Sequence, residues 1–116
     1  MIILLNQKLI DLTNFCMVLY NVTVGIDPDI ENEWLSWMKS NHIPAVMATD
    51  MFSEYKIFKV LSQGEEESIS YSVQYFAEKV DMVVKYLNEF APPLVEEHRK
   101  RYQNKHVAFR TLLEEV

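Results

Sequence analysis

The chain has 116 residues, which is enough for one domain with a hydrophobic core and too few for two. Its apolar fraction of 49% and charged fraction of 24% are those of an ordinary globular protein, so disorder over most of the length is excluded. The formal net charge of −6 would repel phosphate, and we therefore expect neither nucleic acid nor a membrane as a partner. The single cysteine, Cys16, cannot form an internal disulfide, which favours a reducing compartment and predicts a cytoplasmic protein.

The first sixteen residues are expected to lie outside the domain. The apolar run before Asn6 is too short for an export signal and far too short to span a bilayer. Because Met17 stands directly before the first convincing strand, we expect it to be the natural start and residues 1–16 to be an upstream extension. The alternative is an amphipathic N-terminal helix. A single domain is then predicted over residues 17–116.

Residues 19–26 (LYNVTVGI) predict the first strand, around which the sheet is organised. Strand side chains alternate between faces with period two. One face would carry Tyr20, Val22, Val24 and Ile26, and the other Leu19, Asn21, Thr23 and Gly25. A polar face without charges indicates that something covers it.

A helix is predicted to start at Asp27-Pro28-Asp29, with an aspartate cap and proline at the first helical position. It should end near Asn41, because Ile43 precedes Pro44 and the residue before proline avoids helical geometry. The apolar stripe of this helix consists of Ile30, Trp34, Trp37 and Met38, which we interpret as core. Residues 44–51 are then a connection with one helical turn at 45–48.

The rest of the chain predicts three more strands and two helical pieces. The strands lie at residues 52–61, 68–77 and 107–113, with a hairpin loop at 62–67. The second helix should bury Val80, Val83, Val84, Leu87 and Ala91, be broken or kinked at Pro92-Pro93, and be followed by a helical piece over residues 94–103. Within that piece the basic run at 98–101 should form ion pairs four residues apart, Glu96 with Lys100 and Glu97 with Arg101.

The element order βαββαβ predicts an α+β fold of the ferredoxin-like kind, a four-stranded antiparallel sheet with strand order 4-1-3-2. Its helices can cover only one face. Residues 52–61 carry apolar side chains on both faces of the strand, so a second copy of the chain should cover the other face. We therefore expect a homodimer.

Four ordered motifs carry a resemblance to a known family. They are W-L-S-W-M-K-S-N-H-I-P at residues 34–44, M-A-T-D-M-F at 47–52, Y-S-V-Q-Y at 71–75 and A-F-R-T-L-L at 108–113. Together they resemble an uncharacterised bacterial domain-of-unknown-function family, number 4286. The resemblance implies a ferredoxin-like fold of the dimeric α/β-barrel kind, without an assigned activity. The chain departs from the family pattern at Asp50, where glycine is typical and would better tolerate a left-handed turn.

The sheet face away from the helices would gather several neutral polar groups around one arginine. These are Asn21, Thr23, Ser70, Ser72, Gln74 and Arg110. They could line a closed cavity that binds a small organic molecule with a carboxylate or carbonyl. The alternative is a dimer interface whose polar groups satisfy each other and water.

His42 is the weak candidate for catalysis. At a helix end its side chain could cap the last carbonyls. Alternatively it acts as a general acid or base beside Arg110 in a cofactor-independent monooxygenase- or isomerase-like enzyme. A third hypothesis is a purely structural interaction module. We expect no cofactor and no metal, because His98 and His106 lack a recognisable ligand spacing and no phosphate-binding or nucleophile motif is present.

Overall fold

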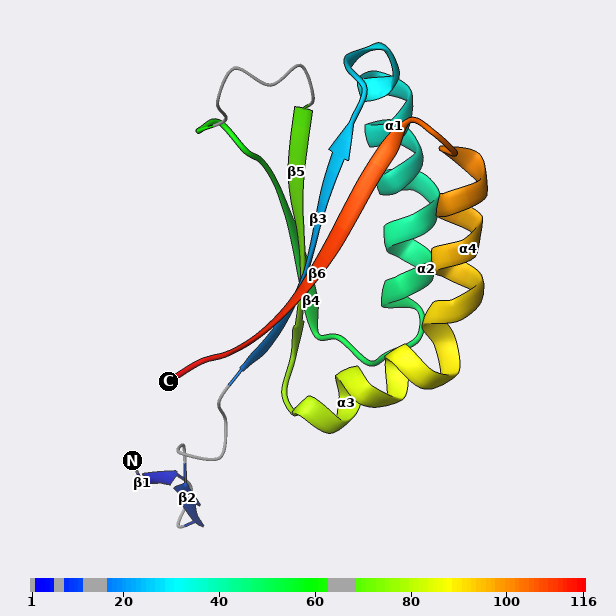
Figure 1. Ribbon diagram of the computed structural model, residues 1–116. Helices are drawn as coiled ribbons and strands as arrows, with labels where there is room; N and C mark the ends of the chain where they lie inside the picture. Colours follow the sequence, from blue (N-terminus) through cyan, green and yellow to red (C-terminus); the bar gives the residue numbers. More distant parts are fainter. Residues whose placement is uncertain (1, 6–7, 12–16, 63–68) are drawn as a thin grey trace.

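The computed structural model describes the backbone of residues 2–5 and 8–11 and all atoms of residues 17–62 and 69–116. Its main body is a four-stranded antiparallel sheet with a layer of helices on one side (Figure 1). The strands are β3 (Val18–Ile26), β4 (Glu54–Lys59), β5 (Ile69–Ala77) and β6 (His106–Glu114). Most of the hairpin loop predicted at residues 62–67 lies outside the described residues.

The strands are arranged in the order β4-β5-β3-β6, which confirms the predicted ferredoxin-like order 4-1-3-2. β3 lies at the centre and is paired along its whole length with both β5 and β6. Val22 is opposite Val73 on one side and Arg110 on the other. Asn21 is opposite Gln74 and Thr111. Because directly paired residues point to the same face, these two rows occupy opposite faces of the sheet.

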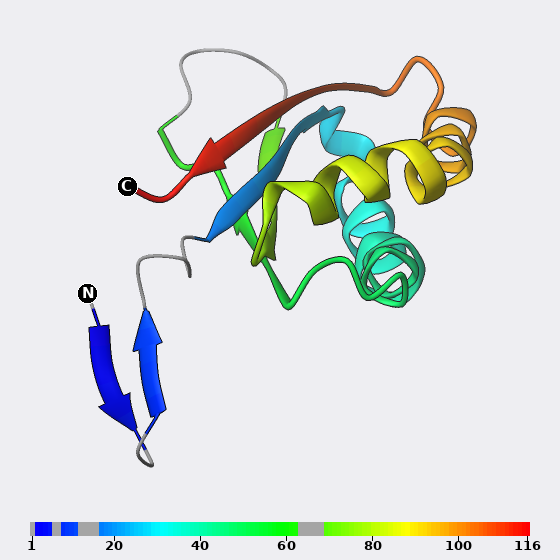
Figure 2. The same ribbon diagram turned by 90° about the horizontal axis from the view of Figure 1, so that it is seen from below.

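Two helical segments form the second layer, on one side of the sheet in both views (Figures 1 and 2). The first consists of η2 (Pro28–Ile30), α1 (Glu31–Trp37), the π turn η3 (Met38–His42) and α2 (Ile43–Met47), and the second of α3 (Val80–Lys85), the π turn η4 (Tyr86–Phe90) and α4 (Ala91–Arg101). Within the described part of the chain, no helix has the length and apolar character needed to cross a bilayer.

The prediction that the first helix ends near Asn41 is wrong. The helix passes through Pro44, because the preceding turn widens so that the Ile43 N–H donates to the carbonyl of Met38, five residues back. The second segment does the same before its prolines, where the Ala91 N–H donates to the carbonyl of Tyr86. Proline lacks an N–H and would leave a carbonyl unpaired in a regular α-helix. A π turn lets the chain continue past it and kinks the axis.

The core lies between the sheet and the helices. Trp34, Trp37 and Met38 are buried there, and so are His98 and Tyr102 from the last helix. The predicted stripe of the second helix is wrong in part, since three of its members are exposed: Val80 (47%), Val84 (48%) and Leu87 (38%). Val83, Tyr86 and Ala91 are the residues of this stretch that are buried against the core, and the wide turn that begins at Tyr86 changes the phase of the helix between Tyr86 and Ala91.

The structure tests the predictions made for Asp27 and Asp50. Asp27 precedes Pro28 as predicted, but its carboxylate makes no cap and instead lies 3.7 Å from the Lys105 ammonium. Asp50 has a φ of 63°, so the loop does adopt the left-handed conformation that glycine would take more easily. Residues 2–5 and 8–11 form a pair of antiparallel strands, β1 (Ile2–Leu5) with β2 (Lys8–Asp11), and not the alternative amphipathic helix.

Candidate functional site

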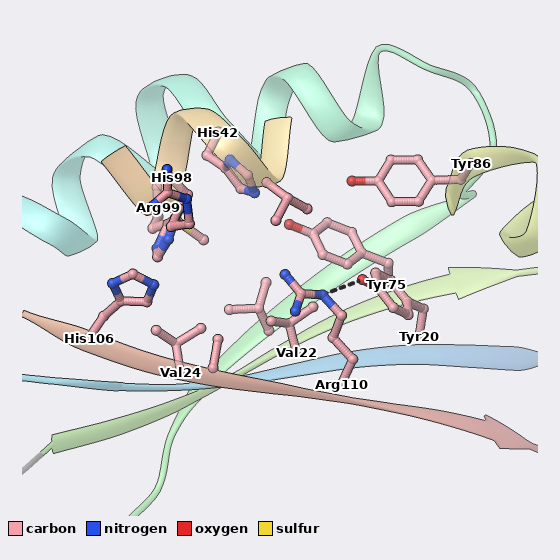
Figure 3. Close-up of a pocket in the computed structure, with 14 residues that line it drawn as sticks. Tyr20, Val22, Val24, His42, Tyr75, Tyr86, His98, Arg99, His106 and Arg110 are labelled. Atoms are coloured by element: carbon pink, nitrogen blue, oxygen red, sulfur yellow. Dashed lines mark hydrogen bonds between the residues drawn. The ribbon is translucent and has the colours of Figure 1, made fainter. Parts of the chain in front are cut away.

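A cavity of about 210 Å³ lies between the sheet and the helical layer (Figure 3). Its floor comes from β3, β5 and β6, and its roof from the two π turns and α4. The lining residues are Tyr20, Val22, Val24, Met38, His42, Val73, Tyr75, Tyr86, Val95, His98, Arg99, His106, Ala108 and Arg110. Most of the wall is aliphatic or aromatic, with a few polar groups directed inward, which is the usual composition of a small-molecule site.

Arg110 does not share a face with Asn21, so the single polar surface expected from the sequence does not exist. The pairing of Arg110 with Val22 places it on the helix side of the sheet, in the cavity. Thr23, Ser72 and Gln74 share the opposite face with Asn21. We call that face, which points away from the helices, the open face.

Arg110 is the one arginine of the chain that has no acidic partner among the described residues. Arg99 is held by Glu96, and Arg101 by Glu33. Arg110 instead donates from Nε to the Tyr20 hydroxyl at 3.0 Å, with its guanidinium directed into the cavity (Figure 3). An unpaired guanidinium beside an apolar cavity is suited to a carboxylate or another anionic oxygen.

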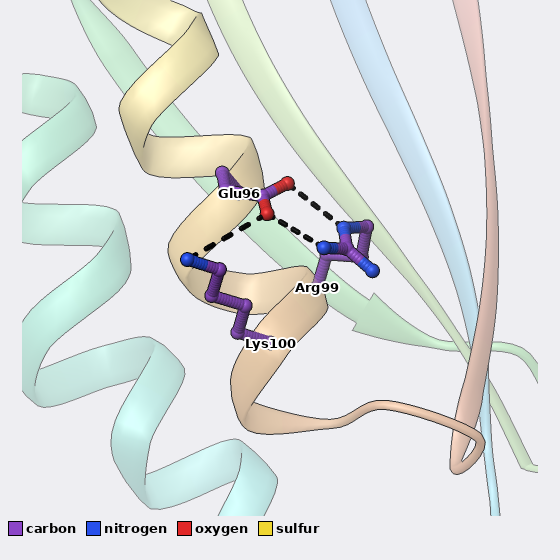
Figure 4. A network of polar contacts seen from close by, with 3 residues as sticks. All are labelled: Glu96, Arg99 and Lys100. Carbon is purple, nitrogen blue, oxygen red and sulfur yellow. Dashed lines mark hydrogen bonds and ion pairs between the residues drawn. The ribbon is translucent and has the colours of Figure 1, made fainter.

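Glu96 explains why Arg99 is not equivalent to Arg110, although both line the cavity. Figure 4 shows Glu96 bound to Arg99 through two hydrogen bonds of 2.8 and 2.6 Å, with Lys100 3.9 Å away. The predicted pair of Glu96 with Lys100 is present. The predicted pair of Glu97 with Arg101 is replaced by the contact of Arg101 with Glu33 on the first helical segment, at 2.6 Å.

Tyr75 carries a buried hydroxyl that has no hydrogen-bond partner within the described residues. The residue is 2% exposed, and Figure 3 shows its hydroxyl pointing into the same space as the Arg110 guanidinium. Burial raises the pKa of Tyr75, and also that of Tyr20 and Tyr86, so all three phenols stay protonated at neutral pH. An unpaired buried hydroxyl is costly, and a ligand oxygen in the cavity would satisfy it.

His42 lies in η3 and lines the cavity, so it is not the C-terminal cap that was one of its two predicted roles. Its ring lies between those of Trp37 and His98, at centroid distances of 5.5 and 5.8 Å, tilted against the first and edge-on to the second. Burial, assisted by the positive charge of Arg110, lowers the pKa of His42 to about 4. The imidazole is therefore neutral at pH 7, and it is a weaker base than an exposed histidine.

His98 lines the cavity beside His42 and is held in one tautomer. Its Nε2 accepts a hydrogen bond of 2.9 Å from the Trp34 indole N–H. Burial, with smaller contributions from His106, His42 and Arg110, lowers its pKa to about 3. Among the described residues, no group of three or more His, Cys, Asp or Glu side chains is arranged to hold a metal ion.

The polar residues of the open face are bonded to each other. Gln74 donates to Ser72 at 3.1 Å, Ser72 donates to Asn21 at 2.6 Å, and Asn21 donates to Thr23 at 2.9 Å. Apolar residues of the two edge strands on the same face are well exposed, including Phe58 (51%), Phe109 (62%) and Val107 (71%). This pattern is that of an apolar surface with an internally satisfied polar centre.

Sequence reasoning assigned several cavity residues to the core or to no role. Tyr75, Tyr86, His98 and His106 are not among the site candidates that the sequence indicates. Tyr75 and His98 are indeed buried. The prolines at 44 and 92–93 are the sequence feature that could have indicated these residues, since each follows a π turn that carries cavity residues.

The neutral histidines predict that the protein loses stability in mild acid. An unfolded histidine binds a proton below about pH 6.5, whereas folded His42 and His98 resist protonation to about pH 4 and 3. The free energy of unfolding should therefore fall by up to about 1.4 kcal/mol per pH unit for each of them as the pH drops from 6.5 to 4.5. The paired carboxylates, whose pKa values are lowered, contribute only below that window.

Urea unfolding at several pH values would measure this slope. The His98→Gln variant keeps an acceptor for the Trp34 N–H and removes one titrating group, so its slope should be about half that of the parent. Equal slopes in the two proteins would contradict the proposed contribution of His98 to the pH dependence of stability.

The fold is similar to that of solved proteins with little sequence identity. An ethyl tert-butyl ether D (EthD) family protein from Bacillus halodurans is 9% identical, with 85% of this chain and 99% of that one covered and a TM-score of 0.64. A dimeric ferredoxin-like protein from an uncultured marine organism is 10% identical (87% and 96% covered, TM-score 0.55). The hydroxynitrile lyase of Passiflora edulis is 11% identical (86% and 95% covered, TM-score 0.57). Such identities show the fold alone.

No curated protein matches the chain significantly. One family model does, and it covers residues 17–116, which contain the whole four-stranded sheet, both helical segments and every residue of the cavity. The chain belongs to the family described as Domain of unknown function (DUF4286).

Proposed function

We propose that this protein is a homodimer that binds a small organic molecule, carrying a carboxylate or carbonyl group, in the cavity between sheet and helices. The observation that carries the proposal is the guanidinium of Arg110, which has no acidic partner in the described structure and faces an apolar cavity. Beside it lies the unpaired hydroxyl of Tyr75. The terminal nitrogens of Arg110 and the Tyr75 hydroxyl are donors that have no acceptor among the described residues, and they fit a ligand oxygen that accepts from both.

The rest of the cavity favours a compact and mostly apolar ligand. Val22, Val24 and Val73 form part of the floor, and Met38 and Val95 part of the roof. His42 and His98 are neutral, so they add no further positive charge that would call for a second anionic group. A single carboxylate on an apolar body matches this distribution.

Replacement of Arg110 tests the proposal. Benzoate is a suitable probe, because it combines one carboxylate with an apolar ring. We expect benzoate to raise the melting temperature of the parent protein, and the Arg110→Gln variant to bind it roughly 10-fold or more weakly, since a hydrogen bond to a charged group is lost. Calorimetric titration and thermal melts would measure both effects.

A matched control separates local binding from net charge. Lys100→Gln makes the same change of charge at an exposed position, where the ammonium lies 3.9 Å from Glu96, and should leave benzoate binding unchanged. If a panel of carboxylates and ketones, benzoate included, shifts the melting of Arg110→Gln as much as that of the parent, the site is refuted and an interaction module remains.

The proposed dimer is formed through the open face. Two copies packed sheet on sheet would bury Phe58, Phe109 and Val107, which are exposed in the single chain. The polar centre adds little cost to this burial, because the hydrogen bonds from Gln74 through Ser72 to Asn21 are already made. A structural neighbour named as a dimeric ferredoxin-like protein supports the proposal of a dimer.

A charge on the open face should disrupt this dimer. Phe109→Glu would place a carboxylate within the interface without a partner, so light scattering after size-exclusion chromatography should report a monomer at micromolar concentration. Phe109→Leu keeps the apolar contact and should remain dimeric. A parent protein that is monomeric under the same conditions would contradict the proposal.

A second candidate function, an enzyme without a cofactor, is favoured by one observation. His42 is neutral and lines the same cavity as Arg110. His42 could take a proton from carbon beside a carbonyl, while the electron pair moves to the carbonyl oxygen and Arg110 stabilises the resulting enolate. Such a step begins both isomerisation and cofactor-independent oxygenation.

Proton exchange distinguishes this enzyme from a binding protein. In D₂O at pH 7, the parent protein should accelerate deuterium incorporation at the α-carbon of phenylpyruvate above the buffer rate, as measured by proton NMR. The His42→Gln variant should lose most of the acceleration, on the order of 10²-fold or more, and keep its affinity for benzoate. Equal exchange rates in buffer alone, with the parent and with the variant would refute the catalytic proposal and leave the binding proposal standing.

A further inference from the structure

The cavity has two polar ends separated by a small residue. Arg110, Ala108 and His106 follow one another along the helix-facing side of β6, opposite Val22, Val24 and Ile26 of β3. Four residues of strand place the Cα atoms of Arg110 and His106 roughly 13 Å apart. The methyl group of Ala108 leaves the space between them open, and Figure 3 shows the two side chains at different ends of it.

The Arg110 end is made of donors. The guanidinium donates from Nε to Tyr20, and its terminal nitrogens have no hydrogen-bond or ion-pair partner among the described residues. The Tyr75 hydroxyl, buried and unpaired, points into the same space. A carboxylate has enough lone pairs to accept from both groups at once.

The histidine end offers one donor and one acceptor, because hydrogen bonds fix both rings. The Trp34 indole N–H donates to Nε2 of His98, so neutral His98 carries its proton on Nδ1. Nδ1 of His106 lies 2.7 Å from the carbonyl oxygen of Tyr102 and must donate to it, which leaves Nε2 as an acceptor in the neutral ring. The two rings are neighbours, with centroids 4.8 Å apart.

We propose that the ligand is a hydroxy-substituted carboxylic acid with a flat apolar body, held by its carboxylate at Arg110 and Tyr75 and by its hydroxyl at His98 and His106. A hydroxyl group is the simplest one that accepts from His98 Nδ1–H and donates to His106 Nε2. The aromatic or unsaturated body lies over Ala108. This assignment rests on the proposed function and adds the class of ligand.

Two matched pairs of acids test the ligand class by calorimetric titration at pH 7.5. They are 4-hydroxybenzoate with benzoate, and 4-hydroxycinnamate with cinnamate. The parent protein should bind at least one hydroxy acid about 10-fold more tightly than its unsubstituted partner, because the missing hydroxyl leaves two histidine groups unpaired. Tyr75→Phe should weaken both members of a pair equally, and it should fold normally because its hydroxyl has no partner to lose.

His106→Phe keeps the aromatic contact with His98 but removes the acceptor. It should reduce the preference for the hydroxy acid, because only the hydrogen bond from His98 remains, while the affinity for the unsubstituted acid stays unchanged. A preference as large as that of the parent overturns the role of His106. If the parent binds both members of each pair equally, the hydroxy-acid assignment fails and the proposed function stands. If none of the four acids binds, the proposed function fails as well. The comparison with the parent protein decides the ligand class even if the variant does not fold.

Discussion

The register of β3 between β5 and β6 determines what this domain presents on each of its two faces. Val22 is paired with Arg110, so the arginine lies under the helices beside Tyr20. Asn21 is paired with Gln74, so the polar chain of side chains lies on the other face. A slip of one residue would exchange the two sets, because alternation has period two. One face consequently carries a cavity with an arginine that has no acidic partner in the described part of the chain, and the other an apolar surface suited to a second sheet.

Charge is distributed around the cavity in a way that the net charge of −6 does not reveal. Among the described residues, most basic side chains that make polar contacts are paired with an acidic side chain, as Lys59 is with Glu31 and Arg101 with Glu33. Burial keeps His42 and His98 uncharged. Arg110 thus supplies the local positive potential in an otherwise apolar space, where an interaction with an anion is screened less than at the surface. An acidic protein can in this way attract a small anion to one place.

Much of the fold could be predicted from the sequence, whereas the placement of its most informative residue could not. Alternation in residues 19–26 and 68–77 is clear, and the order of elements leaves few topologies. In β6, however, Phe109 and Leu113 on one face are as apolar as Ala108 and Leu112 on the other. Alternation there separates two faces without saying which one is inside, so Arg110 was assigned to the wrong side. Pairing with β3 settles the question, and pairing is a long-range property.

Both helical segments place a π turn directly before proline, at Met38–His42 and at Tyr86–Phe90. A π turn holds one residue more than the α-helical turn it replaces, and each residue of an α-helix advances the rotation by about 100°. Deleting one residue between Trp37 and Pro44 would therefore regularise the helix and swing His42 away from Arg110. The number of residues ahead of each proline therefore helps to determine the shape of the cavity. A relative that kept every lining side chain but was one residue shorter in that stretch would therefore have a cavity of a different shape.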